Sequence, residues 1–375
     1  MKKLVILSAL AVMPMALVMA APPATRPPAT GRAMPPGGGR AMPPAPALTA
    51  THPANSPIAP GAMPTKLAGD MAWTEGAASD KDGNIYFVDQ DNDNLMKWEF
   101  DKASDDPLKG KLSVFLHPSG YSNGMCFDND GNLIDCADEK NELWSIAAPF
   151  PPLPAGATSF KPADLKITVL IKNFDPAAKK INPDTGGKLL NGPNDVWVIP
   201  AGPQKGGLYI TDPLYSRKYW GAVRPANDRT IQMPGKYVYF LSPDHKTLTP
   251  VITDYNTPNG IIGTPDGKTL YVADIGANQT YSFTIKDDGT LTDKKPFCPA
   301  GSDGMTIDSD GNVYTTNFNA ATGVQIWSKD GKRVDSVPVS SGNCCFGCKD
   351  GNVLFICANH EIYGVKMKTH RVGPQ

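Results

Sequence analysis

Six polar residues stand at matching positions of a phrase that recurs along the chain, and their side chains have the chemistry of a cation site. In each copy the polar residue precedes an apolar stretch, an Asp/Gly turn and a second apolar stretch. Carboxylates and amide carbonyls offer only oxygen ligands, which a hard divalent cation such as Ca²⁺ prefers. The six residues, called anchors from here on, are Glu75, Asn123, Asn194, Asn259, Asp303 and Asn343.

A single Asn-Gly or Asp-Gly pair more often marks a bend at the start of a strand than a ligand, because both pairs suit turns. Here the pairs stay in phase with the repeat. Two of the anchors, Glu75 and Asp303, are acidic where an asparagine would serve a bend equally well. Their charges would balance a divalent ion. The pattern therefore favours a metal site where the repeats converge.

The repeat has the length of one blade of a β-propeller. Units of about 40–50 residues with a turn between apolar runs are typical of four-stranded blades around a central channel. In such a ring the inner strands run along the channel, so equivalent residues of successive blades meet at one end. Pro- and Gly-rich insertions at 149–187 and 215–236 lengthen two intervals, and we expect them to form loops. The sequence thus predicts an all-β fold, a six-bladed β-propeller over residues 65–375.

The last repeat lacks one strand, and the segment before the first repeat could supply it. Third and fourth apolar runs such as LMKWEF and LSVFL follow in most units, whereas the sixth unit ends at Gln375 after EIYGV. Residues 65–70, TKLAGD, have the pattern of a strand but belong to no unit. We predict that this N-terminal strand pairs into the last blade, because the pairing would remove an exposed sheet edge.

The N-terminal segment has the pattern of an export signal. Residues 1–20 contain two lysines, an apolar stretch and a small-residue site before Ala21, which predicts a signal peptide. The apolar stretch is shorter than the roughly 20 residues that span a bilayer. We therefore expect a periplasmic or secreted protein without a stable membrane span. Residues 21–64 are rich in Pro, Ala and Gly, and this composition predicts a disordered tether.

Charge and motif content exclude several classes of function. The chain has 36 Lys and Arg residues against 37 Asp and Glu, with no basic cluster outside the extreme N-terminus, so we expect no nucleic-acid partner. It contains neither a Gly-x-Ser-x-Gly elbow nor a phosphate-binding glycine loop, so serine-hydrolase and nucleotide chemistry have no support. Among the histidines only His117 lies just before an anchor, and it could approach the channel mouth as a catalytic histidine.

The seven cysteines leave two interpretations open. Cys126 and Cys136 flank a single hairpin turn, and Cys344 or Cys345 stands in a similar relation to Cys357. Cross-strand disulfides would fit this spacing, although an odd number leaves at least one cysteine unpaired. Buried reduced cysteines in tightly packed strands fit the sequence equally well.

The segments around the anchors resemble the gluconolactonase, regucalcin and luciferin-regenerating enzyme family. The resemblance is carried by EGAAS at Glu75, GPNDVWV at Asn194, TPNGIIG at Asn259 and SDGMTI at Asp303. It covers the chain from about residue 65 onward. It implies a six-bladed propeller that hydrolyses sugar lactones or related esters with one divalent ion, usually Ca²⁺, with Zn²⁺, Mg²⁺ or Mn²⁺ as alternatives. The expected partner is a small-molecule lactone or ester.

The resemblance also assigns metal ligands and a base. Asp303 matches the general base of the family, and Asp195 or Asp212 could assist it. The residues that match the metal ligands are Glu75, Asn194, Asn259 and Asp303.

Substrate contacts are expected from anchors and from the second insertion, and two positions depart from the family pattern. Trp220 in that insertion is a further aromatic candidate. Ala77 stands where the family has a proline, and Gly192 stands where some members place an arginine that holds a sugar acid. The expected substrate contacts are Asn123, Asn194 and Tyr215.

Two other functions share these sequence features. A propeller that binds a ligand or a partner protein could use the same ring with a structural metal. A phosphotriesterase-like hydrolase could use the same ion with a different pocket. The acidic pair Glu75 and Asp303 favours an enzyme, because a binding scaffold could use asparagine at both positions. The sequence leaves the exact substrate, the metal and the oligomeric state open.

Overall fold

β-Strands form most of residues 51–373, the part of the chain that the computed structural model describes. Six antiparallel sheets of four strands each follow in chain order, and each sheet is one blade. Blades one to three consist of β2 (Thr74–Ser79), β3 (Ile85–Asp89), β4 (Asn94–Phe100) and β5 (Gly110–Leu116); β6 (Ser122–Phe127), β7 (Leu133–Ala137), β8 (Glu142–Ile146) and β9 (Ile167–Ile171); and β12 (Val196–Val198), β13 (Leu208–Asp212), β14 (Tyr237–Leu241) and β15 (Leu248–Ile252). Blades four to six consist of β16 (Pro258–Gly263), β17 (Thr269–Asp274), β18 (Gln279–Ile285) and β19 (Leu291–Cys298); β20 (Met305–Ile307), β21 (Val313–Thr315), β22 (Val324–Trp327) and β23 (Arg333–Val337); and β24 (Asn343–Gly347), β25 (Val353–Ala358), β26 (Glu361–Lys366) and β1 (Thr65–Ala68).

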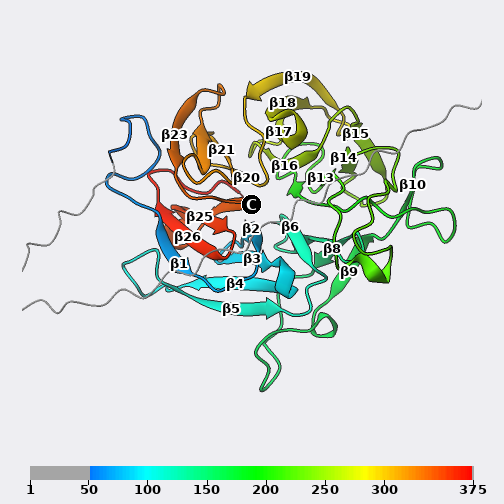
Figure 1. Ribbon diagram of the computed structural model, residues 1–375, viewed down its shortest axis with the longest axis horizontal. Coiled ribbons are helices and arrows are strands. Elements are labelled where there is room, and N and C mark those ends of the chain that lie inside the picture. Colours follow the sequence, from blue (N-terminus) through cyan, green and yellow to red (C-terminus); the bar gives the residue numbers. More distant parts are fainter. Residues whose placement is uncertain (1–50, 374–375) are drawn as a thin grey trace, which may run out of the picture. The chain divides into compact units, whose positions relative to one another are not determined.

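The inner strands of the blades form a closed ring. Contacts run from β2 through β6, β12, β16, β20 and β24 and back to β2. Figure 1 shows β2, β6, β16 and β20 around the middle, with β5, β19 and β23 toward the outside. The all-β, six-bladed β-propeller predicted from the sequence is therefore confirmed.

The predicted closure by the N-terminal strand is also confirmed. β1 pairs antiparallel with β26, with Thr65 opposite Gly364 and Lys66 opposite Tyr363. The outer edge of the sixth sheet is thereby built from the beginning of the propeller sequence, while its other strands come from the end. The sixth sheet thus closes the ring, because it contains strands from both the beginning and the end of the propeller sequence.

The second insertion lies between two blade strands, as expected, whereas the first contains the blade strand β9, and both carry additional structure. The first, 149–187, contains a small hairpin besides β9, and the second, 215–236, contains one of five short 3-10 helices. These additional elements are β10 (Phe174–Asp175), β11 (Lys180–Ile181), η1 (Gln90–Asn92), η2 (Pro162–Asp164), η3 (Trp220–Ala222), η4 (Ile275–Ala277) and η5 (Lys349–Gly351).

The repeated Asp-x-Asp-Gly-Asn sequence forms a self-capped turn between first and second strands. In blade one, Asp80 Oδ1 accepts the backbone N–H groups of Asp82 and Asn84, and Asp80 Oδ2 accepts Asn84 Nδ2. The glycine, Gly83, has φ 89°, which other residues resist. The same bonds recur at Asp128 in blade two and at Asp308 in blade five.

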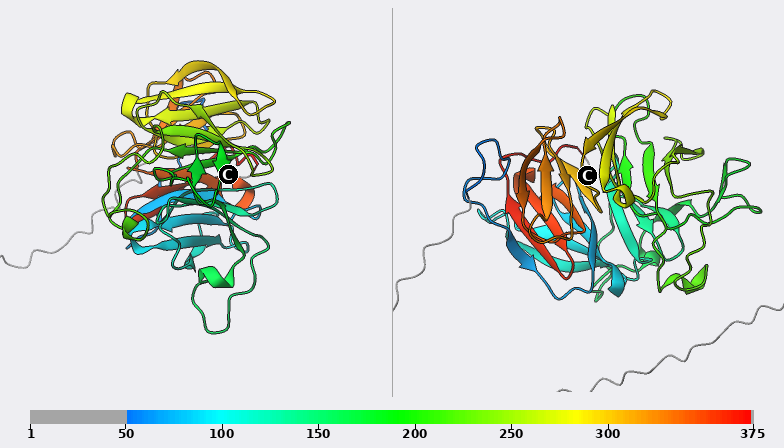
Figure 2. Two further views of the ribbon diagram at one scale, coloured as in Figure 1. Left: turned by 90° about the vertical axis from the view of Figure 1, so that its right-hand side faces the viewer. Right: turned by 45° about the horizontal axis from the view of Figure 1, so that its top comes forward.

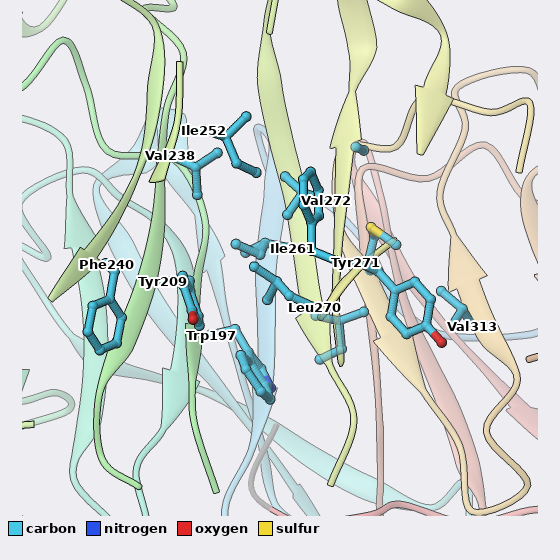
Figure 3. Packing of buried hydrophobic residues seen from close by; sticks show 14 of the residues in the cluster. Trp197, Tyr209, Val238, Phe240, Ile252, Ile261, Leu270, Tyr271, Val272 and Val313 are labelled. Carbon is cyan, nitrogen blue, oxygen red and sulfur yellow. The ribbon is translucent and has the colours of Figure 1, made fainter. Parts of the chain in front are cut away.

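Apolar side chains fill the space between neighbouring blades. Between blades three and four, Trp197 and Tyr209 pack in one cluster with Ile261 and Leu270 (Figure 3). Side chains alternate between the two faces of a strand. Because each blade is covered on both faces by its neighbours, its strands carry apolar residues on both. Figure 2 shows the sheets from two further directions as separate layers, which this packing holds together.

The boundary expected between tether and propeller is wrong for residues 51–64. Ile58 is 2% exposed and forms an isolated bridge with Met367, after β26. Ser56 Oγ donates a hydrogen bond of 2.6 Å to Asp335 in β23. One buried isoleucine and its polar neighbours thus dock this segment on blades five and six, despite its proline content. The predicted signal peptide, and residues 21–50 of the predicted tether, lie outside the described residues.

All seven cysteines are buried and none forms a disulfide. The strand register explains why, because Cys126 lies opposite Ile134 rather than Cys136, and Cys357 lies opposite Asn343 rather than Cys344. The cysteines are therefore reduced, which is the second of the two interpretations.

Within residues 51–373, no helix has the length and apolar character needed to cross a membrane.

Candidate active site

Irregular strand pairing re-aims the anchors of three blades. In blade one, residues 76–77 directly after the anchor lie opposite the single residue Phe87. In blade two the pair 123–124 lies opposite Cys136, and in blade four the pair 259–260 also shares one position of the partner strand. Such β-bulges bend a strand and redirect its side chains. These three anchors, Glu75, Asn123 and Asn259, are therefore next to kinks within the inner strands rather than in turns before them.

The glycine that follows an anchor allows neighbouring blades to approach. A Cβ atom on Gly76, whose φ is 49°, would lie 1.9 Å from Asn123 O, and one on Gly124 would lie 2.0 Å from Asp195 Oδ1. Gly124 N instead donates a 2.7 Å hydrogen bond to Asn194 O of the next blade. The anchor-glycine pairs thus set the close spacing of the inner strands.

Four of the six anchors converge on one cavity of about 480 Å³. Glu75, Asn123, Asn194 and Asp303 line it directly. Tyr215, from the second insertion, lines it as well. The structure therefore brings together residues from blades one, two, three and five that are up to 228 positions apart, as the difference between 303 and 75 gives.

Asn259 joins this group through Asp303. Its Nδ2 atom donates hydrogen bonds to Asp303 Oδ1 at 2.7 Å and to the Tyr215 hydroxyl at 3.0 Å. Its carbonyl oxygen, Oδ1, is buried and has no hydrogen-bond partner among residues 51–373. A buried amide oxygen without a partner is costly, so this atom is suited to a ligand that the chain itself does not supply.

Asn343, the sixth anchor, contacts the site through Glu75. It lines a small space of about 20 Å³ in the ring interior rather than the main cavity. Its side chain forms a hydrogen bond with Glu75, and its Oδ1 accepts Cys344 N at 2.8 Å.

Three carboxylates lie close enough at this site to repel one another: Glu75 and Asp195 are buried, and Asp303 is partly buried. Burial raises the pKa of Glu75 well above its usual range, and the charges of Asp303 and Asp195 raise it further. Burial and the charge of Asp303 likewise raise the pKa of Asp195. The pKa of Asp303 is raised to about 6 by burial, against the Asn259 hydrogen bond and the charge of Arg217. A cation among these groups would relieve their repulsion.

The oxygen atoms at this site fit a hard divalent cation if amide oxygens act as ligands together with the carboxylates. Within residues 51–373, no group of three or more His, Cys, Asp or Glu side chains could hold a metal by itself. Glu75 and Asp303 supply carboxylates, and the unpartnered oxygen of Asn259 supplies an amide ligand. Ca²⁺ accepts such mixed oxygen sets.

Three sequence candidates lie elsewhere. Asp212 accepts the backbone N–H groups of Asn191 and Gly192, so it holds the approach to β12. Trp220 is fully buried and is packed rather than open to substrate. His117 lines a separate surface depression, where its Nδ1 lies 3.2 Å from Asp93 O. These positions contradict three possibilities that the sequence left open: catalytic assistance from Asp212, a substrate contact at Trp220 and access of His117 to the channel.

Sequence reasoning missed much of the cavity wall. The missed residues mostly follow the second strand of a blade, because the loops from second to third strands open at the same end of the ring as the anchors. That position relative to the repeat is the signal that could have found them. The missed lining residues are Trp73, Gln90, Arg217, Ile275, Asn278, Gly301, Ser302, Thr316, Asn317 and Phe318.

The chain has counterparts among known proteins. Residues 73–360 match the family described as the SMP-30/Gluconolactonase/LRE-like region. A gluconolactonase from Zymomonas mobilis is 27% identical over 334 residues, which cover 81% of each chain. A gluconolactonase structure from Xanthomonas campestris is 22% identical with a TM-score of 0.65, covering 85% of this chain and 94% of that one. Regucalcin from Agrobacterium tumefaciens, described as a calcium-binding protein, is 15% identical with a TM-score of 0.55, covering 81% and 94%.

Proposed function

Because the chain belongs to the SMP-30/gluconolactonase/LRE-like family, we propose that it hydrolyses lactones, and sugar lactones in particular, in the anchor-lined cavity. The observation that carries the proposal is the convergence of Glu75, Asn194 and Asp303 on one cavity, with Asn259 bonded to Asp303. The gluconolactonase name of the Zymomonas relative supports the same substrate class. The reaction adds water to the lactone carbonyl carbon and breaks the ring C–O bond, which gives a hydroxy acid.

Glu75, Asn194, Asn259 and Asp303 would hold a divalent cation in this proposal. The unpartnered Asn259 oxygen and the mutual repulsion of the carboxylates support such a site. The description of the regucalcin neighbour as calcium-binding favours Ca²⁺ over Zn²⁺, Mg²⁺ or Mn²⁺. When bound, the cation supplies a Lewis acid that polarises the lactone carbonyl.

Asp303 is the proposed general base. Asn259 holds its Oδ1 atom, so the other carboxylate oxygen can accept a proton from the attacking water. The Tyr215 hydroxyl accepts a hydrogen bond from Asn259, which leaves its own proton for a substrate oxygen. Asn123 and Asn194 line the same cavity and would position the substrate.

Hydrolysis assays test this proposal against its alternatives. Purified protein is offered glucono-1,5-lactone, an aryl ester and a phosphotriester, each before and after treatment with a chelator. We expect lactone hydrolysis that is lost in chelator and restored by Ca²⁺. If the protein hydrolyses only the phosphotriester, it is a phosphotriesterase-like hydrolase and the lactonase proposal fails. A protein that hydrolyses none of these substrates would be a binding module.

Export to the periplasm or the outside of the cell is a separate proposal that rests on the residue 1–20 pattern. Mass spectrometry of the protein purified from its native source measures the mature N-terminus. We expect it at Ala21, and a cytoplasmic protein that begins at Met1 would contradict export.

A further inference from the structure

We propose that Arg217, carried by the second insertion, is a specificity-determining residue that binds hydroxyl groups of a neutral polyhydroxylated lactone. The inference rests on the proposed function and names a substrate group that the anchors do not account for. Arg217 lines the cavity, and its side chain is 24% exposed.

A single buried carboxylate fixes the position of Arg217. The side chain of Asp138 is 3% exposed, and its Oδ2 atom accepts a hydrogen bond of 3.0 Å from Arg217 Nε. The same carboxylate accepts the Tyr219 hydroxyl at 2.8 Å and Trp220 Nε1 at 3.2 Å. Asp138 thereby ties the insertion, through three neighbouring residues, to the end of β7.

Further contacts seat the insertion on the ring. Tyr219 stacks on Tyr121 with ring centroids 4.0 Å apart and an interplanar angle of 13°. The Arg224 guanidinium lies 4.3 Å from the Trp220 ring centroid and donates to Asn191 O at 3.0 Å. The segment that carries Arg217 is therefore a built part of the cavity wall.

Gly192 makes room for this arrangement. Its φ is 143°, and a Cβ atom there would lie 3.0 Å from Asp138 Oδ1 and 3.1 Å from Trp220. A side chain at position 192 and the seated insertion would therefore compete for the same space. Glycine at this position leaves room for the insertion that carries Arg217.

The outer end of Arg217 remains available to a ligand. Its Nε atom is used by Asp138, but no hydrogen bond joins either Nη atom to another of residues 51–373. The guanidinium lies 5.6 Å from the Tyr215 ring centroid, and Tyr215 in turn bonds Asn259. A guanidinium can donate hydrogen bonds but cannot accept them. The Nη–H groups of Arg217 can therefore donate hydrogen bonds to oxygen atoms of a ligand bound beside the anchors.

An apolar wall lies on the other side of the ring. Trp73 precedes blade one and Phe318 follows the second strand of blade five, and their ring centroids are 5.8 Å apart. Blades one and five flank blade six, which is opposite blade three in a ring of six. A substrate that spans the cavity would therefore meet aromatic rings at one end and Arg217 at the other. The C–H face of a sugar lactone can pack on the aromatic rings, and its hydroxyl groups can accept hydrogen bonds from Arg217.

Charge favours a neutral substrate over an acidic one. Arg217 is already paired with Asp138, so the pair contributes no net charge. The charges of Glu75 and Asp303 would be balanced by a divalent cation. A carboxylate on the substrate would add a charge that the site does not offset.

The test compares two lactones that differ in their hydroxyl groups. Hydrolysis of glucono-1,5-lactone and of unsubstituted δ-valerolactone is followed by pH-stat with the full chain and with Arg217→Met. We expect the variant to lower kcat/KM for glucono-1,5-lactone about 10- to 100-fold, chiefly through KM, because a hydrogen bond to a charged donor is lost. The value for δ-valerolactone should change less than about threefold. An equal loss for both lactones, or no loss for either, would overturn the proposal.

Lys218→Met is the matched control. Lys218 is the next residue, is 65% exposed and pairs with Asp91 outside the cavity lining. This variant removes a positive charge from the same segment. We expect its kcat/KM for both lactones to equal that of the wild-type protein. A selective loss for glucono-1,5-lactone in Lys218→Met as well would contradict a specific role of Arg217.

Binding of lactams separates this inference from the proposed activity. Glucono-1,5-lactam has the hydroxyl groups of the sugar lactone, and its binding is compared with that of δ-valerolactam by calorimetry. If the full chain hydrolyses no lactone but prefers the sugar lactam, and Arg217→Met loses that preference, the subsite stands and the activity fails. Equal binding of both lactams by the full chain, or an unchanged preference in Arg217→Met, overturns the inference.

A second lactone pair tests the charge of the substrate. D-glucono-1,4-lactone and D-glucaro-1,4-lactone have the same ring, but only the second carries a carboxylate. We expect the full chain to favour the neutral lactone at least about tenfold in kcat/KM, because like charges repel in the cavity. A preference for the acidic lactone would overturn the neutral substrate class.

Discussion

At the scale of residues, the site brings three carboxylates together, and the Asn259 amide oxygen beside them has no hydrogen-bond partner among residues 51–373. Glu75 and Asp303 were identifiable from the sequence because they break the asparagine pattern of the anchors. Asp195 stands next to an anchor, but its place in the same charged cluster depends on the ring. Arg217 was not identifiable, since nothing in the insertion sequence tells which of its cations turns toward the cavity.

Replacement of Asp303 by asparagine should separate catalysis from folding. Asp303→Asn keeps the shape of the side chain but removes the proposed base, so we expect kcat/KM for glucono-1,5-lactone to fall about 10²- to 10⁴-fold. The exposed turn residue Asp310, in the same blade, provides the control Asp310→Asn. Near-normal turnover by Asp303→Asn, with the control unchanged, would rule out Asp303 as the base.

Asp135 predicts a pH dependence of stability apart from the cavity. Ser122 Oγ lies 2.8 Å from Asp135 Oδ2 and 3.0 Å from Ser119 O, yet one hydroxyl has one proton to donate. A protonated Asp135 would supply the second. Burial raises the pKa of Asp135 to about 7, so the folded protein retains a proton that the unfolded chain releases near its usual pKa of about 4. The Asp135 contribution to stability should therefore decline as pH rises from about 4 to about 7.

Asp135→Asn isolates this contribution. The asparagine amide can donate to Ser122 without titrating, so the variant should lose less stability than the wild type as the pH rises from 5 to 8. Urea unfolding midpoints at several pH values measure the difference. Curves that remain parallel across this range would show that Asp135 does not carry the proton.

At the scale of elements, alternation and turn chemistry were sufficient to predict the strands, because both act within a few residues. The Asp-x-Asp-Gly-Asn turns and the third and fourth strands lie where the sequence predicts them. The bulges at the anchors were not predictable, since they arise from the approach of two blades. Asn-Gly suits a turn, but here Gly124 admits Asp195 of the next blade.

Gly124→Ala should therefore disturb the junction of blades two and three. Its Cβ would lie 2.0 Å from Asp195 Oδ1 and 2.5 Å from Asn194 O, and overpacking of this kind costs about 1–3 kcal/mol. We expect a lower urea midpoint and reduced lactone hydrolysis, because Asn194 must move. Gly221→Ala, where no atom lies within 4 Å of the new Cβ, is the control for both measurements. Equal stability of the two variants would contradict the close approach.

At the scale of the whole molecule, the repeat count and the missing last strand were sufficient to predict the closed ring. Composition failed at the start of the propeller. Residues 51–64 resemble the preceding Pro-rich stretch, yet Ile58 and Ser56 contact blades five and six. Average composition cannot reveal a segment that docks through a few side chains.

Ile58→Ala should destabilise the ring near its closure. Ile58 is 2% exposed and packs in a cluster with Val337 and Met367, so the truncation should cost about 2–5 kcal/mol in unfolding free energy. Met63→Ala, five positions later at a side chain that is 45% exposed, should cost little. Urea unfolding of both variants provides the comparison. A small effect of Ile58→Ala would support the tether expected from composition.

Calorimetric titration of Ca²⁺ into chelator-treated protein tests most directly whether the anchors form one cation site. Glu75→Gln serves as the variant, because it removes a charged ligand while retaining the size of the side chain. We expect a single site per chain in the wild type and at least about tenfold weaker binding in Glu75→Gln. A wild type that binds no divalent cation, or binding that Glu75→Gln leaves unchanged, would contradict the account.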